Sequence, residues 1–210
     1  KPNMLTNSAE CIHQTNASLG ESPLWIPEEN KLYWVDINNH NIHCIDPSNG
    51  KTNSWSCHTE IGCIGRATDG RLVAGMRDGF YYFFPPTGTV DLIVDPEPDK
   101  PANRLNDGKV DRAGRLWCGS MQDPIPDDPV GTLYRLDTSL NCVGMIDEIR
   151  IPNAIAWSPD NRIMYFADTK EKTIWTFDFD LESGEITNKC VFIDLSEQSG
   201  RPDGATVDAD

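Results

Sequence analysis

Short apolar segments recur along the chain at regular intervals. Four of them begin at Lys31, Arg71, Arg115 and Arg162, so their starts are 40, 44 and 47 residues apart. Each follows a turn rich in Asp, Asn or Gly, and each is followed by a second such segment and another turn. The β-branched and aromatic residues in these segments, and the lack of a long apolar pattern at helical spacing, predict β-hairpins.

This repeat predicts the fold class. A unit of about 40 to 50 residues with about four short strands is typical of a β-propeller blade. A β-sandwich also fits an all-β composition, but it does not require the same strand–turn–strand unit at each interval. We therefore expect residues 1–210 to form a single all-β propeller domain.

The last repeat is incomplete. Val207–Asp210 resembles the opening of a further blade, so the chain holds about four and a half repeats. An open propeller leaves an unpaired strand edge and an uncovered blade face, both of which favour aggregation. We expect the chain to be truncated before the last blades, with roughly 80 to 90 residues, or two repeats of about 40 residues, still to follow.

Charge and hydropathy narrow the range of partners. The chain has 18 Lys and Arg against 33 Asp and Glu, a net charge of −15, and this leaves no basic stripe to neutralise phosphates. We expect no nucleic acid, no membrane and no obligate protein partner. No apolar run approaches the ~20 residues of a membrane span, and the N-terminus lacks a signal pattern, so we expect a cytoplasmic protein.

The cysteines and histidines do not indicate a site. The seven Cys residues include no C-x-x-C pair, so neither zinc-ribbon nor thioredoxin chemistry is supported. Buried free thiols are expected, with a single disulfide bridge left open. The four His residues lack the spacing of a metal-binding helix or of a paired nucleophile. Candidate chemistry therefore rests on the carboxylates and amides.

Polar phrases connect the expected blades. The phrases are Leu19–Trp25, Asn103–Asp111, Ile151–Trp157 and Arg201–Asp208. Each places a polar residue just before the expected innermost strand of its blade. Because innermost strands surround a central channel, we expect side chains from the four phrases to converge there, as a catalytic or metal centre requires.

Four motifs, in this order and at this spacing, resemble the family that groups gluconolactonase, senescence marker protein 30 (regucalcin) and luciferin-regenerating enzyme. The motifs are Gly20–Trp25, Arg104–Asp111, Pro152–Asn153 ahead of Trp157–Asp160, and Pro202–Gly204. The agreement extends across the available chain. The resemblance implies a six-bladed β-propeller with one divalent cation on its axis, and an enzyme that hydrolyses a sugar lactone.

The resemblance also implies a role for individual residues. Glu21, Asn153 and Asp203 correspond to the metal ligands, and oxygen-only ligands suit Ca²⁺ best, with Zn²⁺, Mn²⁺, Mg²⁺ and Fe²⁺ left open. Arg104 and Asn106 correspond to the residues that contact the sugar. In this interpretation the metal polarises the lactone carbonyl and Asp203 activates the attacking water.

Each of these residues also has a structural interpretation. Asn153 and Asp203 follow prolines, where Asn and Asp commonly form turns. Asn106–Gly108 is itself a hairpin-turn phrase, and we expect Asp107 to be structural. Asp123 lies near the position of a substrate-contacting acid in some relatives, and the sequence leaves open whether it contacts substrate.

Three functions remain open. The first is a lactonase for an aldono-1,4- or 1,5-lactone such as gluconolactone. The second keeps the site but hydrolyses other esters or organophosphates, and the third is a non-catalytic calcium-binding propeller. Retention of Arg104 and Asn106 alongside Asp203 favours catalysis, because cation storage requires no pair of residues that reads a sugar.

Overall fold

The computed structural model describes residues 10–208, and every regular element in that range is a β-strand. Sixteen strands form four antiparallel sheets of four strands each. The first sheet holds β1 (Gly20–Ile26), β2 (Lys31–Asp36), β3 (Asn41–Asp46) and β4 (Lys51–Ser56). The second holds β5 (Ile61–Arg66), β6 (Leu72–Met76), β7 (Gly79–Phe84) and β8 (Thr89–Val94).

The other two sheets follow in chain order. The third holds β9 (Asn103–Val110), β10 (Leu116–Gln122), β11 (Gly131–Leu136) and β12 (Cys142–Ile149). The fourth holds β13 (Pro152–Trp157), β14 (Ile163–Asp168), β15 (Thr173–Phe179) and β16 (Ile186–Asp194). In each sheet the strands pair in sequence order, so each sheet is one continuous stretch of chain.

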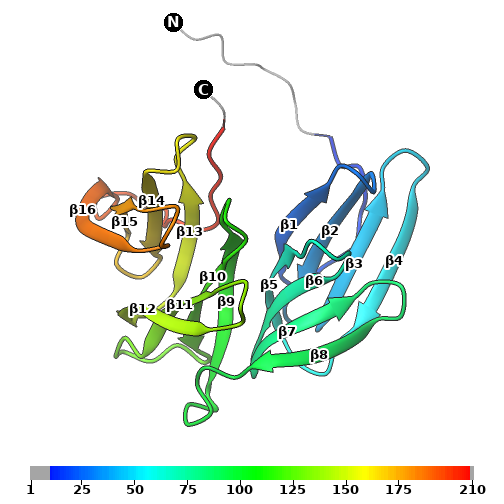
Figure 1. Ribbon diagram of the computed structural model, residues 1–210, viewed down its shortest axis with the longest axis horizontal. Coiled ribbons are helices and arrows are strands. Elements are labelled where there is room, and N and C mark those ends of the chain that lie inside the picture. Colours follow the sequence, from blue (N-terminus) through cyan, green and yellow to red (C-terminus); the bar gives the residue numbers. More distant parts are fainter. Residues whose placement is uncertain (1–9, 209–210) are drawn as a thin grey trace, which may run out of the picture.

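The first strands of successive sheets lie next to one another. β1 contacts β5, β5 contacts β9, and β9 contacts β13, while the later strands of each sheet spread outward (Figure 1). This arrangement of consecutive antiparallel sheets is that of β-propeller blades. The predicted all-β class is therefore confirmed, and the described residues contain four sheets that do not close into a ring.

The polar phrases lie in a different part of each blade from the one expected. The apolar segments that revealed the repeat are second strands, and three of the four phrases form innermost strands instead of the loops that precede them. The period-2 pattern is hidden there because irregular register interrupts the pairing of β1, β9 and β13. Residues 201–208 form no strand, and the last two residues of the expected blade opening, 209–210, lie outside the described residues.

In every sheet, the turn between the first and second strand ends on a residue whose backbone lies in the left-handed region. Asn30, Gly70, Gly114 and Asn161 have φ of 51°, 84°, 85° and 57°. Gly and Asn adopt this backbone region at the lowest cost, so the turn punctuation visible in the sequence has a direct conformational reason.

Side chains between the sheets form the core. Ile42, Ile64 and Phe83 pack between the first and second sheets, and Trp117 and Phe166 pack between the third and fourth. A third cluster, which includes the buried thiols of Cys63 and Cys118, lies between the second and third sheets. All seven cysteines are free, as expected, but only Cys44, Cys63 and Cys118 are buried. This packing fixes neighbouring innermost strands relative to one another.

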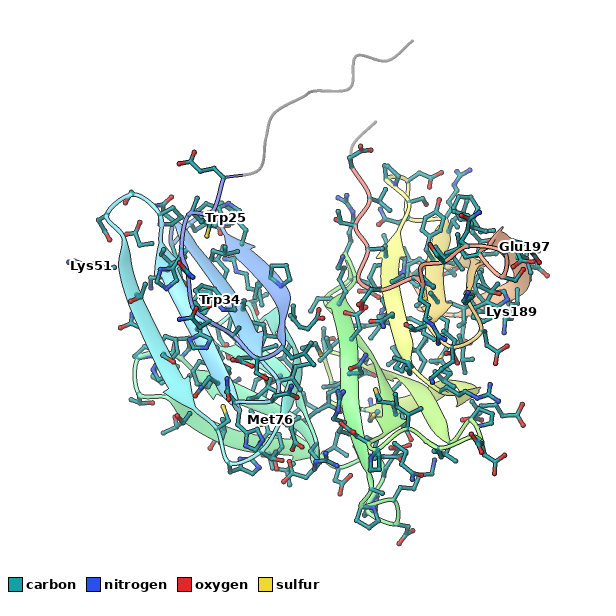
Figure 2. All side chains as sticks on the ribbon, turned by 180° about the vertical axis from the view of Figure 1, so that it is seen from behind. Trp25, Trp34, Lys51, Met76, Lys189 and Glu197 are labelled. Atoms are coloured by element: carbon teal, nitrogen blue, oxygen red, sulfur yellow. The ribbon has the colours of Figure 1, made fainter. Side chains whose placement is uncertain are left out.

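Among the strands, the outermost one of each sheet carries most of the exposed positions. Lys51 on β4 and Lys189 on β16 are both exposed and lie at opposite ends of the row of sheets (Figure 2). β16 also exposes apolar side chains, with Phe192 at 55% exposure. Within residues 10–208, no helix is long and apolar enough to cross a membrane.

Candidate active site

One cavity brings together all five residues predicted from the sequence. Glu21, Arg104, Asn106, Asn153 and Asp203 line a cavity of about 240 Å³, which we call the candidate cavity. They come from β1, β9, β13 and the irregular segment 201–208. Convergence of side chains from four separated parts of the chain is the arrangement expected of a binding or catalytic site.

Backbone irregularities position Glu21 and Asn153. Glu21 precedes Ser22, which has φ of 53°, and Asn153 precedes Ala154, which has φ of 58°. The register of β1 against β2 and of β13 against β14 shifts at these points. Left-handed backbone costs a non-glycine residue about 1–2 kcal/mol. Such bulges occur next to active sites, where they redirect a side chain, and both candidate ligands here sit on one.

A glycine lets two innermost strands approach closely at the wall of the candidate cavity. A Cβ atom on Gly62 of β5 would lie 2.3 Å from the carbonyl oxygens of both Leu105 and Asn106 on β9. No side chain fits at that distance, so any other residue would displace β9. Gly62 therefore helps to fix the backbone that carries Arg104 and Asn106.

Protein contacts hold the Arg104 guanidinium in place. Its Nε donates to Asp123 Oδ2 at 2.9 Å, and its Nη1 donates to Asn106 Oδ1 at 2.8 Å and to the Leu105 carbonyl at 3.3 Å. An Arg side chain has five N–H donors, so the two on Nη2 remain without an acceptor among the described residues. Arg104 is buried, at 6% exposure, and it lines the cavity.

A hydrogen-bond chain continues from Arg104 to the fourth sheet. Asn106 Nδ2 donates to the carbonyl oxygen of Pro152 at 3.0 Å, which ties β9 to the start of β13. Asp123, whose role the sequence left open, anchors the other end of this chain through its ion pair with Arg104. The pair expected to read the sugar is therefore held in a defined orientation before any ligand binds.

A second hydrogen-bond chain joins Asn153 to the segment that carries Asp203. Asn153 Nδ2 donates to Thr169 Oγ1 at 2.8 Å, and Thr169 Oγ1 donates to the carbonyl oxygen of Pro202 at 2.8 Å. Pro202 is buried, and the side chain of Asp203 follows it into the lining of the candidate cavity. Thr169 also lines the cavity.

Negative charge is concentrated around Glu21. Partial burial raises the pKa of Glu21, the carboxylates of Asp203 and Asp107 raise it further, and Arg104 acts in the opposite direction. Burial also raises the pKa of Asp107, while its hydrogen bond from the Ile155 amide lowers it. Burial is the largest cause at both carboxylates, and a positive charge beside Glu21 would favour its ionised form.

The donor set at this point fits a hard divalent cation. Glu21 and Asp203 offer carboxylate oxygens and Asn153 an amide oxygen, which are ligands that Ca²⁺ and Mg²⁺ prefer. A cation would also supply the missing positive charge beside Glu21. Within residues 10–208, no group of three or more His, Cys, Asp or Glu side chains is placed to hold a metal, so the set depends on Asn153.

Sequence reasoning missed several residues of the candidate cavity. Thr169 follows β14 and carries no motif of its own, yet it lines the cavity. Asp107, which the sequence predicts to be structural, lines it too. The apolar side of the cavity was also not foreseen. It consists of Leu19, Ile37, Met121, Ile125 and Ile151. One sequence feature points to Thr169. An Asp ends both β2 and β14, and in β14 it immediately precedes Thr169.

Comparisons with known proteins identify relatives of this chain. The chain is 34% identical over 204 residues to pentonolactonase XacC of Haloferax volcanii, covering 94% of this chain and 66% of that protein. It is 29% identical to 6-deoxy-6-sulfogluconolactonase of Pseudomonas putida, covering 98% of this chain and 70% of that protein. The chain thus spans about two thirds of the length of these relatives.

A solved structure supports the same relationship. The calcium-binding protein regucalcin of Agrobacterium tumefaciens superimposes with a TM-score of 0.90 at 28% identity, covering 94% of this chain and 67% of that one. Residues 19–210 match the SMP-30/Gluconolactonase/LRE-like region. The matched range begins next to Glu21 and includes every residue of the candidate set, so the chain belongs to the SMP-30/gluconolactonase/LRE-like family.

Proposed function

We propose that the protein is a divalent-metal-dependent lactonase that hydrolyses a sugar lactone. The main support is the candidate cavity, where a carboxylate–amide donor set adjoins an Arg–Asn pair held ready for hydroxyl groups. A site that only stores a cation does not require the Arg–Asn pair. The names of the pentonolactonase and sulfogluconolactonase relatives indicate the same substrate class.

The proposed roles follow from the position of each side chain. A bound cation would supply Lewis-acid polarisation of the lactone carbonyl and stabilise negative charge on its oxygen. Glu21, Asn153 and Asp203 would hold it. Asp203 accepts a proton from the water that attacks the carbonyl carbon. The ring C–O bond then breaks, and the proton passes to the leaving oxygen to give the open hydroxy acid.

Arg104 and Asn106 orient the substrate in this proposal. The two Nη2 donors of Arg104 and the remaining N–H of Asn106 can bind ring or side-chain hydroxyls of an aldonolactone such as gluconolactone. The apolar side of the cavity would contact the C–H face of the ring. Ca²⁺ is the cation we propose first, supported by the oxygen-only ligands and by the description of the regucalcin neighbour as calcium-binding.

Two details of the setting belong to the same proposal. The seven free thiols suit a reducing compartment, and we place the protein in the cytoplasm. Four sheets occupy the span that covers 66% of the pentonolactonase, which corresponds to about six in the whole relative. We therefore propose a six-bladed propeller.

The test is hydrolysis of a panel of substrates with and without a chelator. Acid release from gluconolactone, xylonolactone, a simple aryl ester and an aryl organophosphate is measured on the full-length protein. We expect the sugar lactones to be hydrolysed fastest, the chelator to abolish the rate, and Ca²⁺ to restore it. Faster turnover of the ester or organophosphate would favour the second function, and Ca²⁺ binding without turnover would favour the third.

A further inference from the structure

Thr169 occupies a position that its neighbours fix from several sides. It directly follows β14, and its backbone N–H donates to the Ile151 carbonyl at 3.0 Å. The buried carboxylate of Asp168 accepts hydrogen bonds from the backbone N–H groups of Arg150, Ile151 and Lys170. The backbone that carries the Thr169 hydroxyl is therefore held against the residue before β13, and the hydroxyl lies next to Asn153.

The Thr169 hydroxyl has a single proton, and the bond that uses it determines how the Asn153 amide is oriented. A hydroxyl has one proton, and Thr169 donates it to the Pro202 carbonyl at 2.8 Å. Thr169 can then only accept from Asn153, so the NH₂ group of that amide faces Thr169, at 2.8 Å. The amide oxygen of Asn153 is turned the other way. Without the hydroxyl, the amide could rotate and present its NH₂ group where the oxygen stands.

The same hydroxyl holds the segment that carries Asp203. Residues 201–208 belong to no strand, so the sheets do not fix their position. Two side chains bind the segment on either side of Asp203: Thr169 at the Pro202 carbonyl and Lys109 of β9 at the Ala205 carbonyl, each at 2.8 Å. Both the amide oxygen of Asn153 and the carboxylate of Asp203 thus depend on contacts made by Thr169.

We propose that Thr169 is a positioning residue that sets two of the three candidate cation ligands, turning the Asn153 amide oxygen and the Asp203 segment to the same side of the candidate cavity. The proposal rests on the proposed function, because it assumes that these oxygens bind a cation. Residues that orient metal ligands by hydrogen bonding typically change metal affinity by about 10- to 100-fold when they are removed.

The test compares Ca²⁺ affinity across variants of the full-length protein by titration calorimetry. Thr169→Val removes the hydroxyl at nearly constant volume, and we expect Ca²⁺ binding to weaken by about 10-fold or more. Thr169→Ser keeps the hydroxyl and should stay within about 3-fold of wild type. Thr173→Val is the matched control, because its hydroxyl donates to the Glu171 carbonyl at 3.0 Å outside the cavity. It should leave affinity unchanged.

Repeating the Thr169 substitution in the Asn153→Asp variant separates an effect on amide orientation from a general loss of stability. In Asn153→Asp, a carboxylate presents an oxygen in either rotamer, so removal of the Thr169 hydroxyl should matter less there than in the wild-type background. Unfolding by urea in the absence of Ca²⁺ is measured on every variant. Thr169→Ala replaces Thr169→Val as the hydroxyl-free variant if the Val methyl disturbs folding.

The outcomes distinguish this proposal from the one on which it rests. Wild-type affinity in the hydroxyl-free variant, or equal losses in Thr169→Ser and Thr169→Val, would overturn the positioning role and leave the lactonase proposal standing. An equal loss in the Asn153→Asp background would overturn the amide part. A wild-type protein that binds no divalent cation would instead overturn the metal-dependent function itself.

Discussion

At the scale of single residues, the candidate site depends on groups whose hydrogen-bonding capacity is already partly used. Three donors of Arg104 hold Asp123, Asn106 and the Leu105 carbonyl, so its fork is fixed before a ligand arrives. Only a planar guanidinium can make these contacts and still offer donors to a substrate. Arg104 therefore both stabilises the local structure of β9 and is the residue that we propose to bind the lactone.

Arg104→Lys should impair substrate binding more than turnover. An ammonium group keeps the charge but cannot contact Asp123, Asn106 and a sugar hydroxyl with the same geometry. We expect KM for the preferred lactone to rise by about 10-fold or more, with a smaller change in kcat. Steady-state hydrolysis measures both constants. Arg112→Lys, on an exposed turn of the same sheet, is the control, and an unchanged KM in Arg104→Lys would remove Arg104 from the substrate site.

The sequence predicted the residues that carry motifs and missed those that act through contacts. Glu21, Arg104, Asn106, Asn153 and Asp203 stand in recognisable phrases, and the fold brings all five to one cavity. Thr169 could not be found in this way, because its partners lie 16 and 33 residues away along the chain. Such pairings are set by the register of the sheets, which single-sequence patterns do not specify.

At the scale of elements, hairpins were predictable and bulges were not. Turn residues such as Asn30 and Gly114 mark where a strand ends, and their left-handed backbone is the physical reason. The register shift after Glu21 has no such marker, because Ser22 takes positive φ without being Gly or Asn. The sequence pattern therefore indicates loops where the structure has innermost strands.

An ion pair joins the ends of β5 and β6 in the second sheet, and it should affect how the stability of the protein depends on pH. Arg77, after β6, donates to both oxygens of Glu60, before β5, at 2.6 and 2.8 Å. These hydrogen bonds lower the pKa of Glu60 to about 2. Because the folded pKa lies below the ordinary value of 4.5, this stabilisation is present above pH 4.5 and is lost as the pH falls towards 2.

Glu60→Gln should therefore flatten the acid side of the stability profile. We expect the variant to be less stable than wild type at pH 6 by about 1–2 kcal/mol, with the difference shrinking as the pH falls below 4.5. Urea unfolding of the metal-free protein between pH 3 and 6 measures the effect. Glu197→Gln, at an exposed position, should follow wild type throughout. A difference that is constant with pH would show that the ion pair does not couple to folding.

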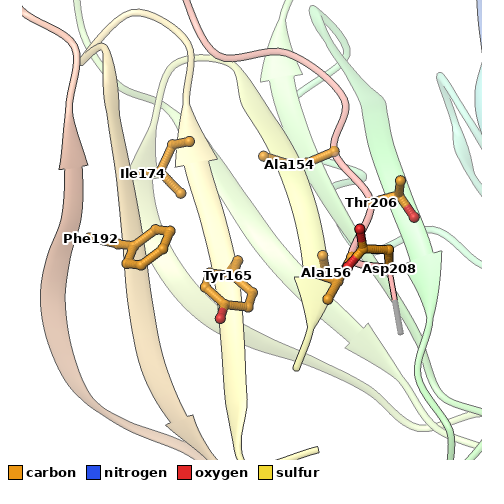
Figure 3. A pocket seen from close by; sticks show the side chains of 9 residues that line it. Ala154, Ala156, Tyr165, Ile174, Phe192, Thr206 and Asp208 are labelled. Atoms are coloured by element: carbon orange, nitrogen blue, oxygen red, sulfur yellow. The ribbon is translucent and has the colours of Figure 1, made fainter. Parts of the chain in front are cut away.

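At the scale of the whole molecule, the repeat predicted the architecture because each blade has the same chain path. The fourth sheet leaves an apolar depression of about 340 Å³ on its face, lined in part by Tyr165, Ile174 and Phe192 (Figure 3). In a β-propeller, the next blade normally packs against such a face. This is the surface where the proposed six-bladed ring would continue.

A chain extended to the length of the relatives should be more stable than residues 1–210. In the extended chain, Phe192→Ser should cost about 2 kcal/mol or more, since a buried aromatic side chain is then lost. In residues 1–210, where Phe192 is 55% exposed, the same change should cost little. Urea unfolding of the four proteins measures the effect. Equal costs in both lengths would contradict the proposed closure.

In the proposed mechanism Asp203 both binds the cation and activates water, while Glu21 only binds the cation. The most direct test is kcat for lactone hydrolysis by Asp203→Asn across a Ca²⁺ titration, with Glu21→Gln alongside. Asp203→Asn keeps an oxygen ligand but loses the proton acceptor, so we expect kcat to fall by about 100-fold or more even at saturating Ca²⁺. Glu21→Gln should recover in part as Ca²⁺ is added. Near wild-type turnover in Asp203→Asn at saturating Ca²⁺ would rule out Asp203 as the proton acceptor.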